Sequence, residues 1–379
     1  MLLLGIMTVP VFADTVAIEQ ESNGGIEQNK ELEEGQKTRW EQILERLPHF
    51  SGYLQTGWNY NSQGEGTNSF QAKRLRLLMD GYVTKQVSFS LQVEAFNGVA
   101  ESANKNGQKN LMVLDAFVTA KINQAFQVRV GQYCLPMGFE NNDLAPGILE
   151  TVDFSNICNR MVGRNAIGYD FEDYGRDLGI MAFGDFLPSR DGCFNYMSYY
   201  LSVTNGHLPN LNDNNKSKDL IGSLVVRPFK NMSVMASYNW GKYDGSVGGK
   251  PVTAQVMNRM IAGIWYHDSQ GLNFRTEYGY ITSGYHGKLV REKSLYSLVG
   301  WHVGEFLPLV RYDFYRDEVN RGTLNNYDRF LVGVSYKPFQ RVRLQANYAY
   351  SLYTPEARKM SNDGKQGSNQ VQIMGIFSF

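Results

Sequence analysis

The sequence lacks two features that would classify the protein at once, namely an excess of charge and a long apolar run. Lys and Arg together number 37, and Asp and Glu also number 37. Net charge therefore points neither to a nucleic-acid-binding protein nor to one that binds acidic substrates. After the first residues, no apolar run approaches the ~18 residues that a membrane helix requires. If the chain enters a membrane, it crosses as strands.

Cysteine and histidine are also scarce, at 3 and 5 residues. Three cysteines cannot all pair with one another, and Cys134 with Cys158 is a candidate bridge; three unpaired thiols are an equal alternative. The histidines are scattered, and none belongs to a convincing catalytic pattern with a serine or an acid. No metal-ligand spacing, phosphate-binding glycine loop or nucleophile elbow occurs. We therefore expect no catalytic residue, no metal site and no cofactor.

The first 49 residues differ from the rest of the chain. Residues 1–13 (MLLLGIMTVPVFA) combine an apolar core with a small-residue cleavage site, which predicts a secretory signal peptide. Residues 14–37 are polar and predict a flexible tail. Thr38 begins a capping box, and apolar side chains follow at helical spacing up to Leu47. We expect a short amphipathic helix in a periplasmic tail (residues 14–49), followed by one domain (residues 50–379).

From residue 50 onward, apolar and polar residues alternate in short segments. Tight turns alternate with longer polar loops, at 61–68, 97–110, 205–217, 243–255 and 354–367. This sorting of connections and an even strand number are typical of outer-membrane barrels, whereas a soluble sandwich would need a second sheet against its apolar face. We therefore predict an all-β, antiparallel transmembrane β-barrel. Its sixteen expected strands are 50–61, 70–84, 86–97, 111–122, 125–134, 174–186, 192–204, 218–229, 231–243, 256–268, 271–283, 290–302, 305–318, 325–339, 340–353 and 367–379.

One segment, Leu135–Asp173, runs for about 39 residues without clear alternation. Irregular segments of this length in ordered domains are usually functional or disordered. Its apolar residues, such as Phe139, Leu149 and Met161, argue against disorder. We expect this segment, the third extracellular loop, to fold inward and narrow the channel.

The apolar face of each strand sets its register, with lipid on that face and water on the other. In 340–353, for example, Val342 and Leu344 alternate with Arg343 and Gln345. On the water side, basic residues outnumber acidic ones. Arginine suits an anion path because it stays charged and offers forked donors to phosphate and carboxylate oxygens. The bases assigned to this side are Arg74, Arg76, Arg129, Arg227, Arg259, Arg275, Arg311, Arg329, Arg341, Arg343, Lys121 and Lys337, and about half are expected to pair with acids such as Glu94, Asp115, Glu277 and Asp313.

Several motifs resemble the phosphate-selective porin O and P family of Gram-negative outer membranes. The segment from Val128 to Glu140 (VRVGQYCLPMGFE) is similar to that family's Gly-Gln-aromatic strand end running into Pro-x-Gly. The resemblance spans the chain from about residue 50 to its end. Further matching motifs, in chain order, begin at Lys73, Leu91, Asp115, Gly175, Val203 and Val310, and the terminal Phe379 also fits.

The resemblance implies a sixteen-stranded, usually trimeric barrel in the outer membrane, with arginines around the third loop. It adds Arg160, Arg164 and Arg176, which lie in or just after that loop, to the candidates. The lysines typical of phosphate specialists are scattered in loops here. We expect a diffusion channel for small solutes that favours anions such as phosphate; the alternatives are an adhesin or structural barrel without selective conduction, and a barrel enzyme. The candidate anion-binding residues are Arg74, Arg76, Arg129, Arg160, Arg164, Arg176, Arg259, Arg275, Arg311, Arg329 and Arg343.

Overall fold

The computed structural model describes most of the predicted barrel domain. The described residues are 47–63, 66–95, 111–163, 175–207, 209–210, 213, 215–247, 250–285, 288–319, 326–360 and 364–379. The predicted signal peptide, nearly all of the predicted tail, and Arg164 lie outside them.

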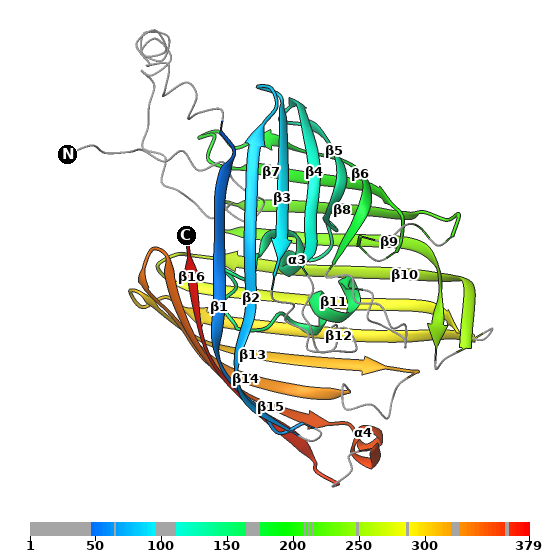
Figure 1. The fold of residues 1–379 in the computed structure, drawn as a ribbon, viewed down its shortest axis with the longest axis vertical. Helices are drawn as coiled ribbons and strands as arrows, with labels where there is room; N and C mark the ends of the chain where they lie inside the picture. The colour runs from blue at the N-terminus through cyan, green and yellow to red at the C-terminus, as the bar shows by residue number, and fades with distance from the viewer. Residues whose placement is uncertain are drawn as a thin grey trace.

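Sixteen antiparallel strands close into one barrel (Figure 1). Each strand pairs with its neighbours in the chain, and β1 pairs with β16 to close the sheet. The predicted fold class and strand number are confirmed. The strands are β1 (His49–Asn61), β2 (Thr67–Tyr82), β3 (Val87–Glu94), β4 (Met112–Asn123), β5 (Phe126–Cys134), β6 (Arg176–Pro188), β7 (Asn195–Thr204), β8 (Asp219–Phe229), β9 (Met232–Val247), β10 (Lys250–His267), β11 (Leu272–Tyr285), β12 (Lys288–Trp301), β13 (Phe306–Asp317), β14 (Tyr327–Phe339), β15 (Val342–Tyr353) and β16 (Gly367–Ser378).

Alternation along each strand separates an exposed outer face from a buried inner face. In β13, Phe306 and Val310 are exposed, whereas Leu309 and Arg311 are buried. Successive side chains of a strand point to opposite faces of the sheet, so exposed apolar residues collect on the outer wall. An apolar outer wall is what a barrel presents to lipid. No helix in the described part of the chain is long and apolar enough to cross a membrane.

The connections divide the barrel into two rims. The short-turn rim carries the turns at residues 83–86, 124–125, 189–194, 230–231, 268–271, 302–305 and 340–341. The long-loop rim lies at the opposite ends of the strands and carries the remaining connections. In outer-membrane barrels the short turns face the periplasm and the longer loops face the outside.

Two of the predicted loops are corrected by the structure. In 243–255, β9 and β10 continue pairing beyond Tyr243 and Gln255, out to Val247 and Lys250. The alternation of apolar and polar residues stops there because both faces of a hairpin above the lipid meet water. The backbones of β9 and β10 nevertheless continue to pair. In 354–367, a short helix α4 (Pro355–Met360) follows Thr354, whose hydroxyl accepts a hydrogen bond from the Ala357 amide at 3.3 Å.

All three cysteines are unpaired, so of the two alternatives for them the unpaired one is correct. The Cys158 thiol lies 4.0 Å from the side-chain oxygen of Asn141, and Asn141 in turn donates to the Leu135 carbonyl at 2.7 Å. The segment after β5 is thus fixed by hydrogen bonds rather than by a disulfide.

Candidate pore and its constriction

The chain after β5 folds back into the barrel. The described part of this connection, residues 135–163, contains the helix α3 (Phe139–Asp143) and the π-helix η2 (Ile157–Val162), and we call it the inner loop. Side chains from distant strands donate to its carbonyls: Arg343 of β15 to Ile148 at 2.8 Å, and Arg259 of β10 to Val162 at 2.7 Å. The inner loop therefore lies within the lumen, in contact with separate parts of the wall.

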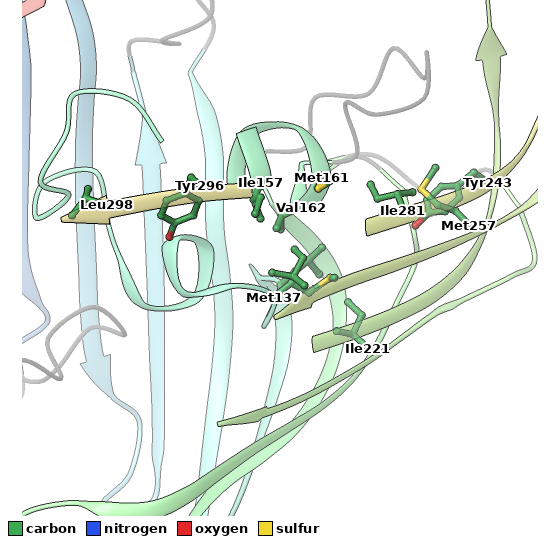
Figure 2. Packing of buried hydrophobic residues seen from close by; sticks show 12 residues of the cluster. Met137, Ile157, Met161, Val162, Ile221, Tyr243, Met257, Ile281, Tyr296 and Leu298 are labelled. Atoms are coloured by element: carbon green, nitrogen blue, oxygen red, sulfur yellow. The ribbon is translucent and has the colours of Figure 1, made fainter. Parts of the chain in front are cut away.

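One face of the inner loop packs on an apolar part of the inner wall. Ile157, Met161 and Val162 of η2 pack with residues of β8 to β12, among them Ile281 and Tyr296 (Figure 2). β11 approaches η2 closely because residue 279 is glycine; a Cβ there would lie 2.3 Å from the Met161 sulfur. Each fully buried Ile, Met or Val side chain contributes roughly 1.5–3 kcal/mol. This packing fixes the loop against one side of the barrel.

A second apolar contact involves α3. Phe139 packs with Tyr133, Met181 and Val225 on the wall from β5 to β9 and meets the ring of Trp265 edge-on. Gly138, immediately before α3, has φ of +71°, a conformation in which glycine carries no steric penalty. The expectation that the inner face meets only water is therefore wrong over β5 to β12, where the inner loop covers it with apolar contacts.

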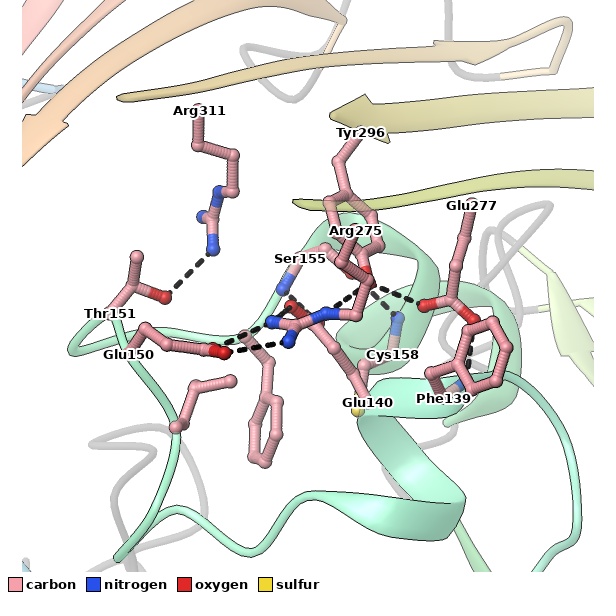
Figure 3. A network of polar contacts seen from close by, with 12 residues as sticks. Phe139, Glu140, Glu150, Thr151, Ser155, Cys158, Arg275, Glu277, Tyr296 and Arg311 are labelled. Atoms are coloured by element: carbon pink, nitrogen blue, oxygen red, sulfur yellow. Dashed lines mark hydrogen bonds and ion pairs between the residues drawn. The ribbon is translucent and has the colours of Figure 1, made fainter. Parts of the chain in front are cut away.

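A buried polar network anchors the middle of the inner loop (Figure 3). Arg275 of β11 is fully buried and donates to both carboxylate oxygens of Glu150, at 2.8 and 2.9 Å. It also donates to the Tyr296 hydroxyl at 2.9 Å and approaches Glu140 at 3.4 Å. Glu140 accepts a hydrogen bond from the Ser155 amide at 2.7 Å. Removing one partner of such a buried pair typically costs about 3–5 kcal/mol.

The ionisation of Glu150 follows from this network. Burial alone would raise the pKa of its carboxyl, but the charge and hydrogen bonds of Arg275, with a hydrogen bond from Asn273, lower that pKa to about 2. Glu150 is therefore a carboxylate at neutral pH, and Arg275 is neutralised by it. A buried arginine occupied in this way is not available to a passing anion.

The carboxylate of Asp153 lies on the opposite face of the inner loop. It accepts hydrogen bonds from Lys73 of β2 and from Gln372 of β16, the latter at 2.7 Å. Burial would raise the pKa of the Asp153 carboxyl, but Lys73, Arg74 and Arg329 hold it well below its usual range. The loop is thus charged on this face, toward the strands that it does not cover.

A polar cavity of about 230 Å³ separates this charged face from the wall. Inner-loop residues Asp153, Phe154, Asn156, Asn159 and Arg160 line one side of it. The wall on the other side comes from β13 to β16 and from the region around Asn61. The wall residues are Asn61, Gln63, Arg311, Asp313, Tyr327, Arg329, Ser351, Ser368 and Gln370.

The candidate arginines fall into two groups by their partners. Within the described residues, Arg76 pairs with Glu94 at 2.8 Å, Arg176 with Asp115 at 2.9 Å, Arg259 with Asp219 at 3.7 Å, Arg275 with Glu150 at 2.8 Å, and Arg311 with Asp313 at 2.8 Å. No carboxylate in the described part of the chain forms a salt bridge with Arg74, Arg160 or Arg329. Arg160 and Arg329 line the cavity, and the Arg74 guanidinium lies 5.9 Å from the centre of the Phe154 ring.

Two further candidates contact neutral groups. The Arg129 guanidinium lies over the rings of Phe117 and Phe183, at 4.0 and 5.1 Å from their centres. Arg343 donates to the carbonyls of Ile148 and Leu149. Both side chains brace the wall or the loop. Arg164 belongs to the part of the chain that is not described.

The sequence did not assign Lys73, Glu150 or Asp153 to the pore. Lys73 faces the lumen beside Arg74 because a register shift between Gln55 and Thr56 places an extra residue in β2. Glu150 and Asp153 belong to the same long irregular segment as Arg160. Acids in a segment predicted to enter a lumen rich in arginine were the signal in the sequence that could have identified them. In the described ranges no group of three or more His, Cys, Asp or Glu side chains is placed to bind a metal ion.

A closed sixteen-strand barrel with an apolar outer wall and a lumen narrowed by one loop defines the class of outer-membrane porins. The chain belongs to the phosphate-selective porin O and P family, whose model matches residues 51–262. It is therefore an integral outer-membrane protein of Gram-negative type that forms a diffusion channel. This family and fold are those of channels rather than of enzymes.

Solved porins share the fold. OmpF of Salmonella typhi, in complex with daunomycin, matches with a TM-score of 0.62 and 12% identity, over 88% of this chain and 97% of its own. An anion-selective porin from Comamonas acidovorans gives 0.59 and 14%, over 88% and 99%. The channel DcaP of Acinetobacter baumannii gives 0.58 and 14%, over 88% and 97%. A comparison with curated proteins found no match.

Proposed function

We propose that the channel conducts small anions, phosphate among them, in preference to cations. The observation that carries this proposal is that Arg160 and Arg329 line the cavity, that Arg74 lies beside Phe154, and that none of the three forms a salt bridge with a carboxylate of the described residues. The two acids that line the cavity, Asp153 of the inner loop and Asp313 of the wall, are already bonded to Lys73 and Arg311 respectively. A solute that passes between the inner loop and β13 to β16 therefore meets guanidinium groups with free donors.

The charge arrangement suits passage rather than trapping. Conduction requires a site strong enough to attract an ion and weak enough to release it. Arg329 hydrogen-bonds to Gln370, and Arg160 lies over the ring of Tyr315 at 5.1 Å, so each guanidinium is held in place by neutral groups. An anion can exchange between such groups without breaking an ion pair. The name of the Comamonas porin describes it as anion-selective, which agrees with this proposal for a barrel of the same fold.

The reversal potential of the purified protein in a planar bilayer tests the proposal. Under a tenfold KCl gradient we expect a reversal potential of the sign for chloride preference, and we expect added phosphate to reduce the chloride current by competing for the same arginines. A reversal potential of the sign for potassium preference would contradict the proposal.

We also propose a homotrimer, as the family resemblance implies. The mass of the detergent-solubilised protein tests this proposal.

A further inference from the structure

Three basic side chains form a row on the outer wall near the long-loop rim. Arg291 and Lys293 lie on β12 and Arg316 on β13. Glu292 and Ser294 flank Lys293 and are buried, as are Tyr315 and Asp317, which flank Arg316. Because strand side chains alternate between faces, the three bases point outward, and we call them the basic row.

The basic row contains a pair of like charges in direct opposition. Lys293 and Arg316 are cross-strand partners in the ladder between β12 and β13. Like charges directly opposite each other destabilise a sheet. An anion bound between the two side chains would relieve this repulsion.

The nearby acids do not neutralise all three bases. Arg316 pairs with Asp328 at 2.6 Å, and Arg291 approaches Glu318 at 3.8 Å. Lys293 forms no ion pair in the described part of the chain; its ammonium lies 5.9 Å from the centre of the Tyr280 ring. Three bases and two acids leave one net positive charge, carried on an exposed lysine between two arginines.

The position of the row matches the boundary between lipid tails and headgroups. On β12 the outward residues below Lys293 are Leu295, Ser297, Val299 and Trp301, and on β13 Tyr312 and Phe314 lie below Arg316. The Arg316 guanidinium lies 5.5 Å from the centre of the Phe314 ring, and the Tyr312 hydroxyl donates to Asp328 at 2.7 Å. Aromatic rings with polar ends mark the membrane interface, so the basic row lies just outside the apolar band.

We propose that the basic row binds a phosphate of a phosphorylated glycolipid in the outer leaflet, of the lipid A type. Lys and Arg are the side chains that bind phosphate oxygens, the first as a point charge and the second through forked donors. The rings of Tyr280 and Phe314 flank the bases and contact the acyl chains or sugar of the same lipid. The inference needs the outer-membrane location and is independent of the ion selectivity proposed above.

Native mass spectrometry of the barrel with bis-phosphorylated lipid A tests the proposal, with dephosphorylated lipid A and phosphatidylglycerol as the other probes. We expect the bis-phosphorylated lipid to bind at least about tenfold more tightly than either of the other two. Dephosphorylated lipid A lacks the phosphate that accepts the charged hydrogen bonds, and phosphatidylglycerol offers only one weakly placed phosphodiester. Lys293→Gln/Arg316→Gln should remove this preference. Arg190→Gln/Lys230→Gln, which removes the same charge from exposed residues at the short-turn rim, should retain it.

Two variants protect the test against a folding defect, since Arg316 also bonds to Asp328. Lys293→Gln breaks no ion pair in the described residues and should still weaken lipid A binding about tenfold. Lys293→Glu places opposite charges across the β12–β13 ladder, so the lipid-free barrel should become more resistant to heat while lipid A no longer adds to its stability. Equal lipid A binding by the wild type and these variants, or equal binding of the dephosphorylated lipid by the wild type, would overturn the proposal.

Discussion

Deletion of residues 141–160 should raise the single-channel conductance about twofold or more. The reason is that the inner loop covers the wall from β5 to β12, half of the strands. The deletion removes Glu150, Asp153 and most of η2, and with them the anchors to Arg275 and Lys73. None of the deleted residues belongs to the strand ladders, so the barrel itself keeps its backbone pairing. Current in a planar bilayer is the measurement.

A deletion at the rim is the matched control. Removing residues 190–193 shortens the turn between β6 and β7 at the short-turn rim, and none of these residues lines the cavity. Its conductance should stay close to that of the wild type. If the deletion of residues 141–160 folds into a heat-resistant barrel with unchanged conductance, the inner loop does not limit the current.

Reversal of two charges in the cavity, Arg160→Glu/Arg329→Glu, should shift the anion-to-cation permeability ratio about thirtyfold toward cations. An ion ~8 Å from a unit charge in water gains or loses about 0.5 kcal/mol, and 0.1 M salt roughly halves this. The two substitutions change the lining by four charge units, so an anion loses about 1 kcal/mol and a cation gains about 1 kcal/mol. The ratio of the two permeabilities therefore changes by about 2 kcal/mol, or about thirtyfold. The reversal potential under a KCl gradient reports the ratio.

The control for this variant carries the same change of charge outside the cavity. Arg190→Glu/Lys230→Glu alters exposed residues of the short turns and should shift the ratio much less. We expect this difference because Arg160 and Arg329 line the cavity and form no salt bridge with a carboxylate of the described residues, whereas Arg190 and Lys230 do not line it. Equal shifts in both variants would mean that net charge, and not this cavity, sets the selectivity.

The barrel follows from local signals in the sequence. Residues on the outer wall, such as Val310 and Phe330, meet lipid whatever their tertiary neighbours, so alternation along a strand reveals them. The inner wall behaves differently. It carries apolar residues such as Met257 and Ile281 at the positions where η2 packs against it. An apolar residue on the inner face looks like an interruption of the pattern until the loop is placed.

The partners of the arginines depend on contacts between distant parts of the chain. Arg275 and Glu150 are 125 residues apart, and neither strand register nor loop composition relates them. The sequence places Arg275 and Arg329 on the same inner face and predicts an equivalent role for both. The position of the inner loop separates them, since it neutralises and buries Arg275 and leaves Arg329 at the cavity.

The most direct test of the account is to locate the conducting path with a charged thiol reagent, after Cys134, Cys158 and Cys193 are replaced by serine. Ser368 lines the cavity on β16, whereas Met257 lies under the inner loop on β10. An anionic reagent added to open channels should reduce the current of Ser368→Cys within minutes and leave that of Met257→Cys unchanged. Block of Met257→Cys with no effect on Ser368→Cys would place the path on the other side of the loop and contradict the account.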